Sequence, residues 1–227
     1  TAAIANSNTF SGAGTLALTA STGAQSLTAT TTTINAAMGD GDDTLTLGGA
    51  ANVTAADTID MGGGTGDSIV ISADGATGAV FDEAGHVGAE TITVAANATT
   101  ASTNGKVTLT YSAAYDQDIT IDATGMTDSG ADFALAVTTA GNVDGDLLVK
   151  GSAGANTLAG GDGNDLFDFS AITAFTAADT VTGGAGTDII RLTADNSATG
   201  GVLDDGHATV ESIAIMASST ATDNAKL

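Results

Sequence analysis

Two stretches of the chain repeat a nine-residue pattern, G-G-x-G-x-D-x-U-x, where U is a large apolar residue; they are residues 160–168 and 183–191. Glycine permits backbone angles that are closed to other residues and lets an ion approach the main-chain carbonyls. Aspartate supplies a hard anionic oxygen of the kind that calcium prefers. The apolar residue begins a short strand with its side chain pointing inward. The pattern therefore predicts calcium-binding turns between short strands of a parallel β-helix.

Three weaker copies support the same interpretation. Residues 38–46 depart from the pattern only at the first glycine, and residues 62–70 have a threonine at the fourth position. Residues 151–159 lack the second glycine and have Asn156 in place of aspartate, and they run directly into the copy that begins at residue 160. Glycine is abundant, at 31 of 227 residues, so a single match would carry little weight. Five matches in phase favour metal-binding turns over the alternative, plain glycine turns without metal.

The chain is strongly acidic. It has 27 acidic and 4 basic residues, which give a formal net charge of -23. Such a charge repels itself unless cations neutralise it, and it argues against nucleic acids and anionic membranes as partners. Solubility alone is the simpler explanation of an acidic composition. Many of the acidic residues lie inside glycine turns, however, where they could converge on cations.

The composition also limits the fold. There is no cysteine, which excludes disulfides and thiolate metal sites. Aromatic residues make up 4% of the chain and the other apolar residues are mostly small, so a globular core would be thin. A solenoid needs only a narrow core, because each coil buries its face on its neighbours. No apolar run approaches the roughly 18 residues of a membrane span, so we expect no membrane insertion.

The chain repeats itself on a longer scale. Residues 39–94 resemble residues 161–215: Gly39 matches Gly161 and, after one inserted residue, Gly62 matches Gly183. Internal similarity of this kind is the mark of a repeat architecture. The chain opens and stops among alanine- and threonine-rich residues, so we expect it to be a segment of a longer protein.

Apolar residues alternate with polar ones in short runs, which predicts strands rather than helices. Turn residues separate these runs. The apolar pairs are Leu16/Leu18, Leu45/Leu47, Ile69/Ile71, Ile92/Val94, Val107/Leu109, Ile119/Ile121, Leu135/Val137, Leu147/Val149, Phe167/Phe169, Ile190/Leu192 and Ile213/Ile215.

We therefore expect an all-β chain, folded as a right-handed parallel β-solenoid (a β-helix or β-roll) with calcium-binding, glycine-rich turns. The expected organisation is β-rich N-terminal coils over 1–38, a first module over 39–94, Thr/Ala-rich β coils without a clear metal motif over 95–150, a second module over 151–215, and a tail or the start of a next coil over 216–227.

The nonapeptides resemble those of the repeats-in-toxin (RTX) family. Together with the Thr/Ala-rich strands and the closing strands Glu-Thr-Ile-Thr-Val (90–94) and Glu-Ser-Ile-Ala-Ile (211–215), they resemble the calcium-dependent surface-layer (S-layer) proteins of bacteria. The resemblance covers nearly the whole chain in style, but in firm motifs only residues 39–94 and 151–215. It implies Ca²⁺ as the cofactor and a secreted protein of the cell surface, exported by type I secretion.

The resemblance also implies which residues bind calcium. The aspartate at the sixth motif position would bridge to carbonyls of a neighbouring turn, a role for Asp43, Asp67, Asp165, Asp188 and, in weakened form, Asn156. Other turn residues complete the candidate set, namely Asp40, Asp42, Asp162, Asn164, Gly184 and Gly186. Asp57 and Asp179 either complete a site or form Asx turns. Because only 151–168 is tandem, we expect a few discrete sites instead of a continuous ion ladder.

A catalytic function is not expected. The sequence has no Gly-x-Ser-x-Gly elbow, no His-Glu-x-x-His motif and no phosphate loop. The two histidines, His86 and His207, occupy equivalent positions in the two modules, as do Glu90 and Glu211. Duplicated placement favours a turn or packing role, since an enzyme rarely needs its base twice.

The sequence thus predicts a calcium-binding structural protein of a bacterial surface layer, which assembles with copies of itself into a lattice. Cell-surface polysaccharide is a further candidate partner. The alternatives are an RTX adhesin, an extracellular filament subunit, or the non-catalytic RTX segment of a secreted hydrolase or toxin.

Overall fold

The computed structural model of the chain describes residues 8–11, 15–17, 21–30, 33–48, 53–72, 78–81, 85–95, 107–111, 117–126, 135–139, 144–169, 174–193 and 207–216. This part of the chain forms strands, turns and loops, with no α-helix. The expectation of an all-β chain is confirmed. Alternating apolar and small polar residues explain this outcome, because they suit a pleated surface with one buried face.

The strands form four sheets. In spatial order, the ten-stranded sheet contains β1 (Asn8–Ser11), β4 (Ser26–Thr30), β7 (Thr44–Leu47), β9 (Ser68–Ser72), β12 (Thr91–Ala95), β14 (Ile119–Asp122), β16 (Leu147–Lys150), β18 (Leu166–Phe169), β20 (Ile189–Thr193) and β22 (Ser212–Met216). The six-stranded sheet contains β10 (Gly78–Phe81), β13 (Val107–Tyr111), β15 (Leu135–Thr139), β17 (Asn156–Gly161), β19 (Thr180–Gly184) and β21 (His207–Ala208). The four-stranded sheet contains β11 (His86–Val87), β8 (Thr58–Asp60), β5 (Thr33–Ala37) and β2 (Thr15–Ala17), and a two-stranded sheet pairs β3 (Ser21–Thr22) with β6 (Gly39–Asp40).

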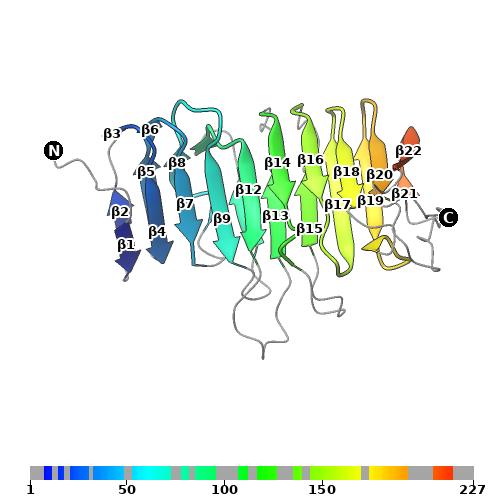
Figure 1. The fold of residues 1–227 in the computed structure, drawn as a ribbon, viewed down its shortest axis with the longest axis horizontal. Coiled ribbons are helices and arrows are strands. Elements are labelled where there is room, and N and C mark those ends of the chain that lie inside the picture. The colour runs from blue at the N-terminus through cyan, green and yellow to red at the C-terminus, as the bar shows by residue number, and fades with distance from the viewer. Residues whose placement is uncertain are drawn as a thin grey trace.

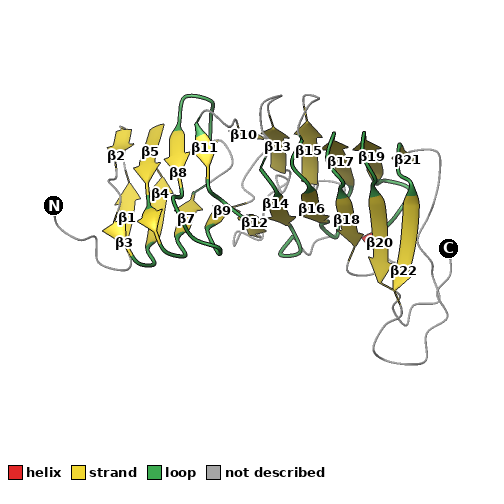
Figure 2. Ribbon diagram, turned by 90° about the horizontal axis from the view of Figure 1, so that it is seen from above, coloured by secondary structure: helices red, strands yellow, loops and turns green. Residues whose placement is uncertain are grey.

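All strand pairs of these sheets are parallel, and neighbours in a sheet are not consecutive in the chain. The chain therefore leaves each sheet and returns one strand further along, so that the strands stack along the long axis of the molecule (Figure 1). Figure 2 shows the ten-stranded sheet along one side, with the four-stranded and six-stranded sheets in line along the other. This arrangement is compatible with a parallel β-solenoid.

We call one turn of the chain from a strand of the ten-stranded sheet to the next a rung. Hydrogen bonds between neighbouring rungs join residues 18 apart at Gln25 and Asp43, 24 apart at Asp43 and Asp67, and 28 apart at Asp118 and Asp146. Rung length therefore varies while the sheet register is kept.

The core is a narrow set of apolar rows between the sheets. On the ten-stranded sheet, inward-pointing residues of one strand stand in register with those of the next. One such buried row runs through Leu27, Leu45, Ile69, Ile92, Ile121, Val149, Phe167 and Ile190. The row continues to Ile213 of β22, which is 39% exposed because no further strand of the described chain covers it.

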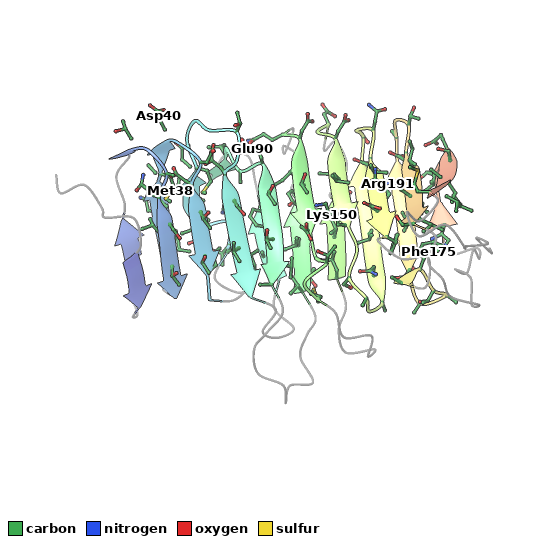
Figure 3. The ribbon with its side chains drawn as sticks, in the orientation of Figure 1. Met38, Asp40, Glu90, Lys150, Phe175 and Arg191 are labelled. Atoms are coloured by element: carbon green, nitrogen blue, oxygen red, sulfur yellow. The ribbon has the colours of Figure 1, made fainter. Side chains whose placement is uncertain are left out.

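A row of alternating charges fixes the register on the outer face. Asp122, Lys150, Asp168 and Arg191 are successive partners on β14, β16, β18 and β20. Lys150 Nζ lies 2.9 Å from Asp122 Oδ2, and Arg191 Nη2 lies 2.6 Å from Asp168 Oδ2. Figure 3 labels Lys150 and Arg191 on this sheet. Each partly exposed pair contributes little energy, but a slip of one residue would place an apolar residue or a glycine opposite each charge.

The alternating apolar pairs fall within strands, except that Leu18 lies outside the described residues. Strands β13, β14, β15 and β16 lie in the Thr/Ala-rich section over 95–150. The expected tail falls, beyond Met216, on residues 217–227, which lie outside the described part of the chain.

Candidate cation site

Glycine turns stack directly on one another at the edge where the chain enters the ten-stranded sheet. Gly39, Gly62, Gly161 and Gly184 all have φ between 90° and 131°, a conformation that favours glycine. The amide of Gly63 donates to the carbonyl of Gly39 at 2.9 Å. In the second module the amide of Ala185 donates to the carbonyl of Gly161 at 2.8 Å. The turns of the two modules therefore stack in the same way.

In the first module, carboxylates link successive turns. Asp43 Oδ1 accepts a hydrogen bond from the amide of Gln25 at 2.6 Å. Asp67 Oδ1 accepts one from the amide of Asp43 at 2.6 Å, and Glu90 Oε2 accepts one from the amide of Asp67 at 2.7 Å. Each carboxylate thus fixes the turn of the preceding rung.

The second module repeats this chain of contacts. Asp165 Oδ1 accepts from the amide of Leu147 at 2.9 Å, and Asp188 Oδ1 accepts from the amide of Asp165 at 2.8 Å. Glu211 Oε2 accepts from the amide of Asp188 at 2.7 Å. Glu90 and Glu211 are therefore the equivalent last members of two short carboxylate ladders. Glu90 is labelled at the upper edge in Figure 3.

The Oδ2 atoms of the four sixth-position aspartates are the candidate ligand atoms. Asp43, Asp67, Asp165 and Asp188 are at most 1% exposed, and their Oδ2 atoms are buried without a hydrogen-bond partner in the described structure. Burying a charged oxygen without a partner is costly. A bound cation would supply the missing interaction.

Burial raises the pKa of all four of these carboxyl groups above the ordinary value of an aspartate, and the charges of nearby acidic residues add to the effect. For Asp165 the pKa rises to about 7, with Asp188 and Asp146 as the acidic neighbours. The hydrogen bond that each carboxylate accepts from a main-chain amide opposes the rise. Burial therefore disfavours the charged form of these four carboxyl groups.

In the second module, each unpaired oxygen faces a main-chain carbonyl beside a glycine. A methyl group on Gly160 would collide with Asp165 Oδ2 and with the carbonyl oxygen of Gly183. A methyl group on Gly183 would collide with Asp188 Oδ2 and with the carbonyl oxygen of Thr209. A carboxylate oxygen and a carbonyl oxygen, both negatively charged or partly so, thus lie close together beside each of these two glycines.

This donor set fits calcium. No three His, Cys, Asp or Glu side chains converge on one point within the described ranges, so a cation here would take most of its ligands from main-chain carbonyls and water. Calcium accepts six to eight such oxygens in irregular geometry. A donor set without nitrogen or sulfur does not select a transition metal.

The remaining turn residues lie on the solvent side. Asp40 and Asp162 are exposed, and Figure 3 labels Asp40 at the upper edge. Asp42 Oδ1 accepts from the amide of Thr65 at 3.2 Å. Asn164 Oδ1 accepts from the amide of Thr187 at 3.0 Å. These side chains form an outer row of hydrogen bonds between turns, while the sixth-position aspartates form the inner row.

The outer row includes two aspartates that sequence reasoning missed as site neighbours. The amide of Asn164 donates to Asp146 Oδ1 at 2.6 Å, and the amide of Asp146 donates to Asp118 Oδ1 at 2.9 Å. Neither aspartate lies in a phased glycine pattern. The Asp-Gly-Asp sequence at 144–146 was the available signal, since such a sequence is typical of a turn.

Asp57 and Asp179 lie in turns elsewhere on the stack and already have hydrogen bonds at both oxygens. Asp57 accepts from the amides of Ile34 at 2.7 Å and Thr54 at 2.6 Å. Asp179 accepts from the amide of Asn156 at 2.8 Å and, in its own turn, from the amide of Thr176 at 2.6 Å. Each carboxylate thus closes its own turn through the amide three residues earlier, which differs from an Asx turn, in which the amide two residues later donates.

Asn156 is also occupied by hydrogen bonds. Its Oδ1 accepts from the amide and the hydroxyl of Ser152, and its Nδ2 donates to the carbonyl of Gly154 and to Asp179. Gly184 and Gly186 belong to the turn of Asp188, and both have positive φ. The structure thus brings Gly184 and Gly186 to the candidate site, whereas Asn156 lies with Asp179.

The structure corrects the position of the inserted residue in the alignment of the two modules. Gly62 and Gly184 are equivalent, because a methyl group on either would collide with the carbonyl oxygen of the equivalent glycine one rung earlier, Gly39 or Gly161. Gly62 therefore matches Gly184 and not Gly183. The inserted residue lies inside the turn, between Gly64 and Asp67, and not before Gly62.

The two histidines pack against aromatic rings. His86 meets Phe81 edge-on, with ring centroids 5.5 Å apart, and His207 stacks on Phe175 at 4.8 Å. His86 is buried. Both rings therefore have a packing role at equivalent places in the two modules.

Comparisons with protein-family models, with curated proteins and with solved structures found no match to this chain. In the described part of the chain, no helix is long and apolar enough to cross a membrane.

Proposed function

We propose that the chain is a calcium-binding structural protein of a bacterial extracellular surface layer, which assembles into a lattice in the presence of calcium. The proposal includes a right-handed parallel β-solenoid, the hand that connections between parallel strands adopt almost always. The single observation that carries it is the set of four buried aspartate oxygens in the glycine turns, which have no hydrogen-bond partner among the described residues.

The location of the charge supports a structural role for calcium. The candidate ligands lie between successive rungs, so a cation bound there would join turns that otherwise bring carboxylates together. Extracellular calcium modules typically bind in the range of 10⁻⁴–10⁻³ M. A chain with no cysteine and a net charge of -23 suits a calcium-rich extracellular environment, where bound metal can stabilise the fold in place of disulfides.

The edge of the described stack at β22 supports pairing with a further strand. Ile213 and Ile215 of β22 occupy core positions, yet they are 39% and 38% exposed. The equivalent residues of β20, Ile190 and Leu192, are fully buried. An apolar strand edge that no described strand covers pairs with another strand, of a further coil or of a second copy, unless it is capped. The same end favours a second candidate, an extracellular filament subunit, because head-to-tail contacts that do not close produce filaments.

A calcium titration by calorimetry tests the calcium part of the proposal. Protein stripped with EGTA and exchanged into calcium-free buffer should bind calcium with a stoichiometry above one, whereas magnesium should bind more weakly because it demands regular octahedral geometry. Absence of calcium binding up to 10 mM, roughly ten times the weakest affinity of extracellular modules, would rule out the proposal.

A further inference from the structure

The two modules differ at the position that, in the second module, lies against the unpaired carboxylate oxygen. Gly39 and Gly161 are equivalent, since both have positive φ and both accept a hydrogen bond from the stacked turn of the next rung. The residues before them are Met38 in the first module and Gly160 in the second. By the same argument Met61 is equivalent to Gly183.

Both methionines are fully buried in the core. At the corresponding places of the second module, even a methyl group would collide with the carboxylate and with a carbonyl of the next rung. A methionine side chain therefore takes the space in which the second module brings its carboxylate and carbonyl together. A thioether is a soft ligand and does not replace an oxygen for calcium.

The first module retains one different pairing of a carboxylate with a carbonyl. A Cβ on Gly64 would lie 2.6 Å from the carbonyl oxygen of Gly41 and 3.0 Å from Asp67 Oδ2. This carbonyl comes from the preceding rung, whereas those of the second module come from the following rung. The inserted residue between Gly64 and Asp67 accounts for the changed position.

We infer that the protein has two classes of calcium site: a tight pair in the second module, at Asp165 and Asp188, and a weaker site in the first module at Asp67. The inference rests on the proposed calcium-binding function and assigns its order of loading. As calcium rises, the second module orders first and the first module follows.

Gly183 couples the two tight sites. Its carbonyl oxygen faces Asp165, and its Cα lies against Asp188 Oδ2. An ion that binds this carbonyl at the Asp165 site therefore also fixes the position of the glycine that lies against Asp188. Loading of the pair is accordingly cooperative.

Calcium calorimetry on the EGTA-stripped full chain, with matched variants, tests the inference. Asp165→Asn and Asp188→Asn are close in shape to the parent residue but lose the anionic ligand. Each should weaken the tight phase by at least the roughly 10–100-fold that loss of an outer-shell metal contact costs. Asp43→Asn and Asp67→Asn, the matched variants of the first module, should leave the tight phase in place.

Hydrogen exchange measured by mass spectrometry gives a second readout that needs no variant. With rising calcium, amides of residues 160–193 should gain protection at a lower concentration than those of residues 39–72. If protection rises together in both, or first in 39–72, or if Asp67→Asn removes the tight phase, the inference is wrong although calcium binding stands. If neither readout responds to calcium, the proposed function itself fails.

Discussion

Removing calcium should lower the stability of this protein by an amount that can be estimated from the number of sites. A ligand that binds only the native state at a hundredfold excess over Kd stabilises it by roughly 2.7 kcal/mol per site. The tight pair at Asp165 and Asp188 would then contribute about 5 kcal/mol. Because native domains have a total stability of roughly 5–15 kcal/mol, loss of two such ions would turn a well-folded chain into a marginal one.

Differential scanning calorimetry measures this effect directly. For a chain of this size, 1 kcal/mol shifts Tm by about 2–4 °C, so calcium should raise Tm by about 10–20 °C over the value in EGTA. Sodium chloride at the same ionic strength is the control, because it screens exposed charges but cannot join two buried oxygens. The double variant with Asp165→Asn and Asp188→Asn should lose most of the calcium-dependent shift.

Equal Tm values in EGTA and in saturating calcium would refute the reasoning. A shift that sodium chloride reproduces would also refute it, since general charge screening would then explain the acidic turns without any site.

Three further predictions follow from individual contacts. The calcium-free protein should be more stable to urea at pH 5 than at pH 8, because burial raises the pKa of Asp165 in the folded protein to about 7. The stability that this protonated carboxyl group contributes is fully present below its unfolded pKa and is lost as the pH rises through its folded pKa. Equal urea midpoints at the two pH values would contradict this. Gly183→Ala should destabilise the protein by about 1–3 kcal/mol, because the added methyl group has no room, whereas Gly63→Ala, which would meet only Asp40 Oδ1 at 3.4 Å, should change the urea midpoint little. Asp179→Ala should cost about 1–3 kcal/mol, because it leaves the buried amide of Asn156 without an acceptor, while the calcium stoichiometry by calorimetry should stay the same; a lower stoichiometry would make Asp179 a ligand.

The strands and the parallel stacking could be predicted from the sequence because both depend on local signals. Alternation of apolar and polar residues gives the strand and its buried face, as at Leu45 and Leu47. Glycines in phase with aspartate give the turns that repeat from rung to rung, as at Gly161 and Asp165. Neither signal depends on the length of the loops on the other side, so variable rung lengths did not obscure them.

Contacts between rungs could not be predicted in the same way. The sequence does not show that Asp146 of one rung meets Asn164 of the next, because that contact depends on a rung of 18 residues. Sequence comparison of the two modules placed the inserted residue before Gly62, because Gly62 and Gly63 can be aligned equally well with Gly183 and Gly184. The positive φ of Gly62 and Gly184, and their close approach to the carbonyls one rung earlier, decide between these alignments.

The role of Asp57 and Asp179 also required coordinates. An aspartate before a strand can bind a metal or cap a turn, and the residue type is the same for both. The hydrogen bonds from Ile34 and Thr54 to Asp57 fill both oxygens. By contrast, the Oδ2 atoms of Asp43 and Asp188 have no such partners within the described ranges, and this difference separates candidate ligands from caps.

The most direct test of the central claim is electron microscopy of the purified protein, imaged in millimolar calcium and, in parallel, in EGTA with sodium chloride at matched ionic strength. We expect ordered two-dimensional arrays with calcium and dispersed particles without it, because in the proposed function calcium both orders the turns and joins acidic faces. Arrays that form equally well in EGTA and sodium chloride would contradict a calcium-dependent lattice.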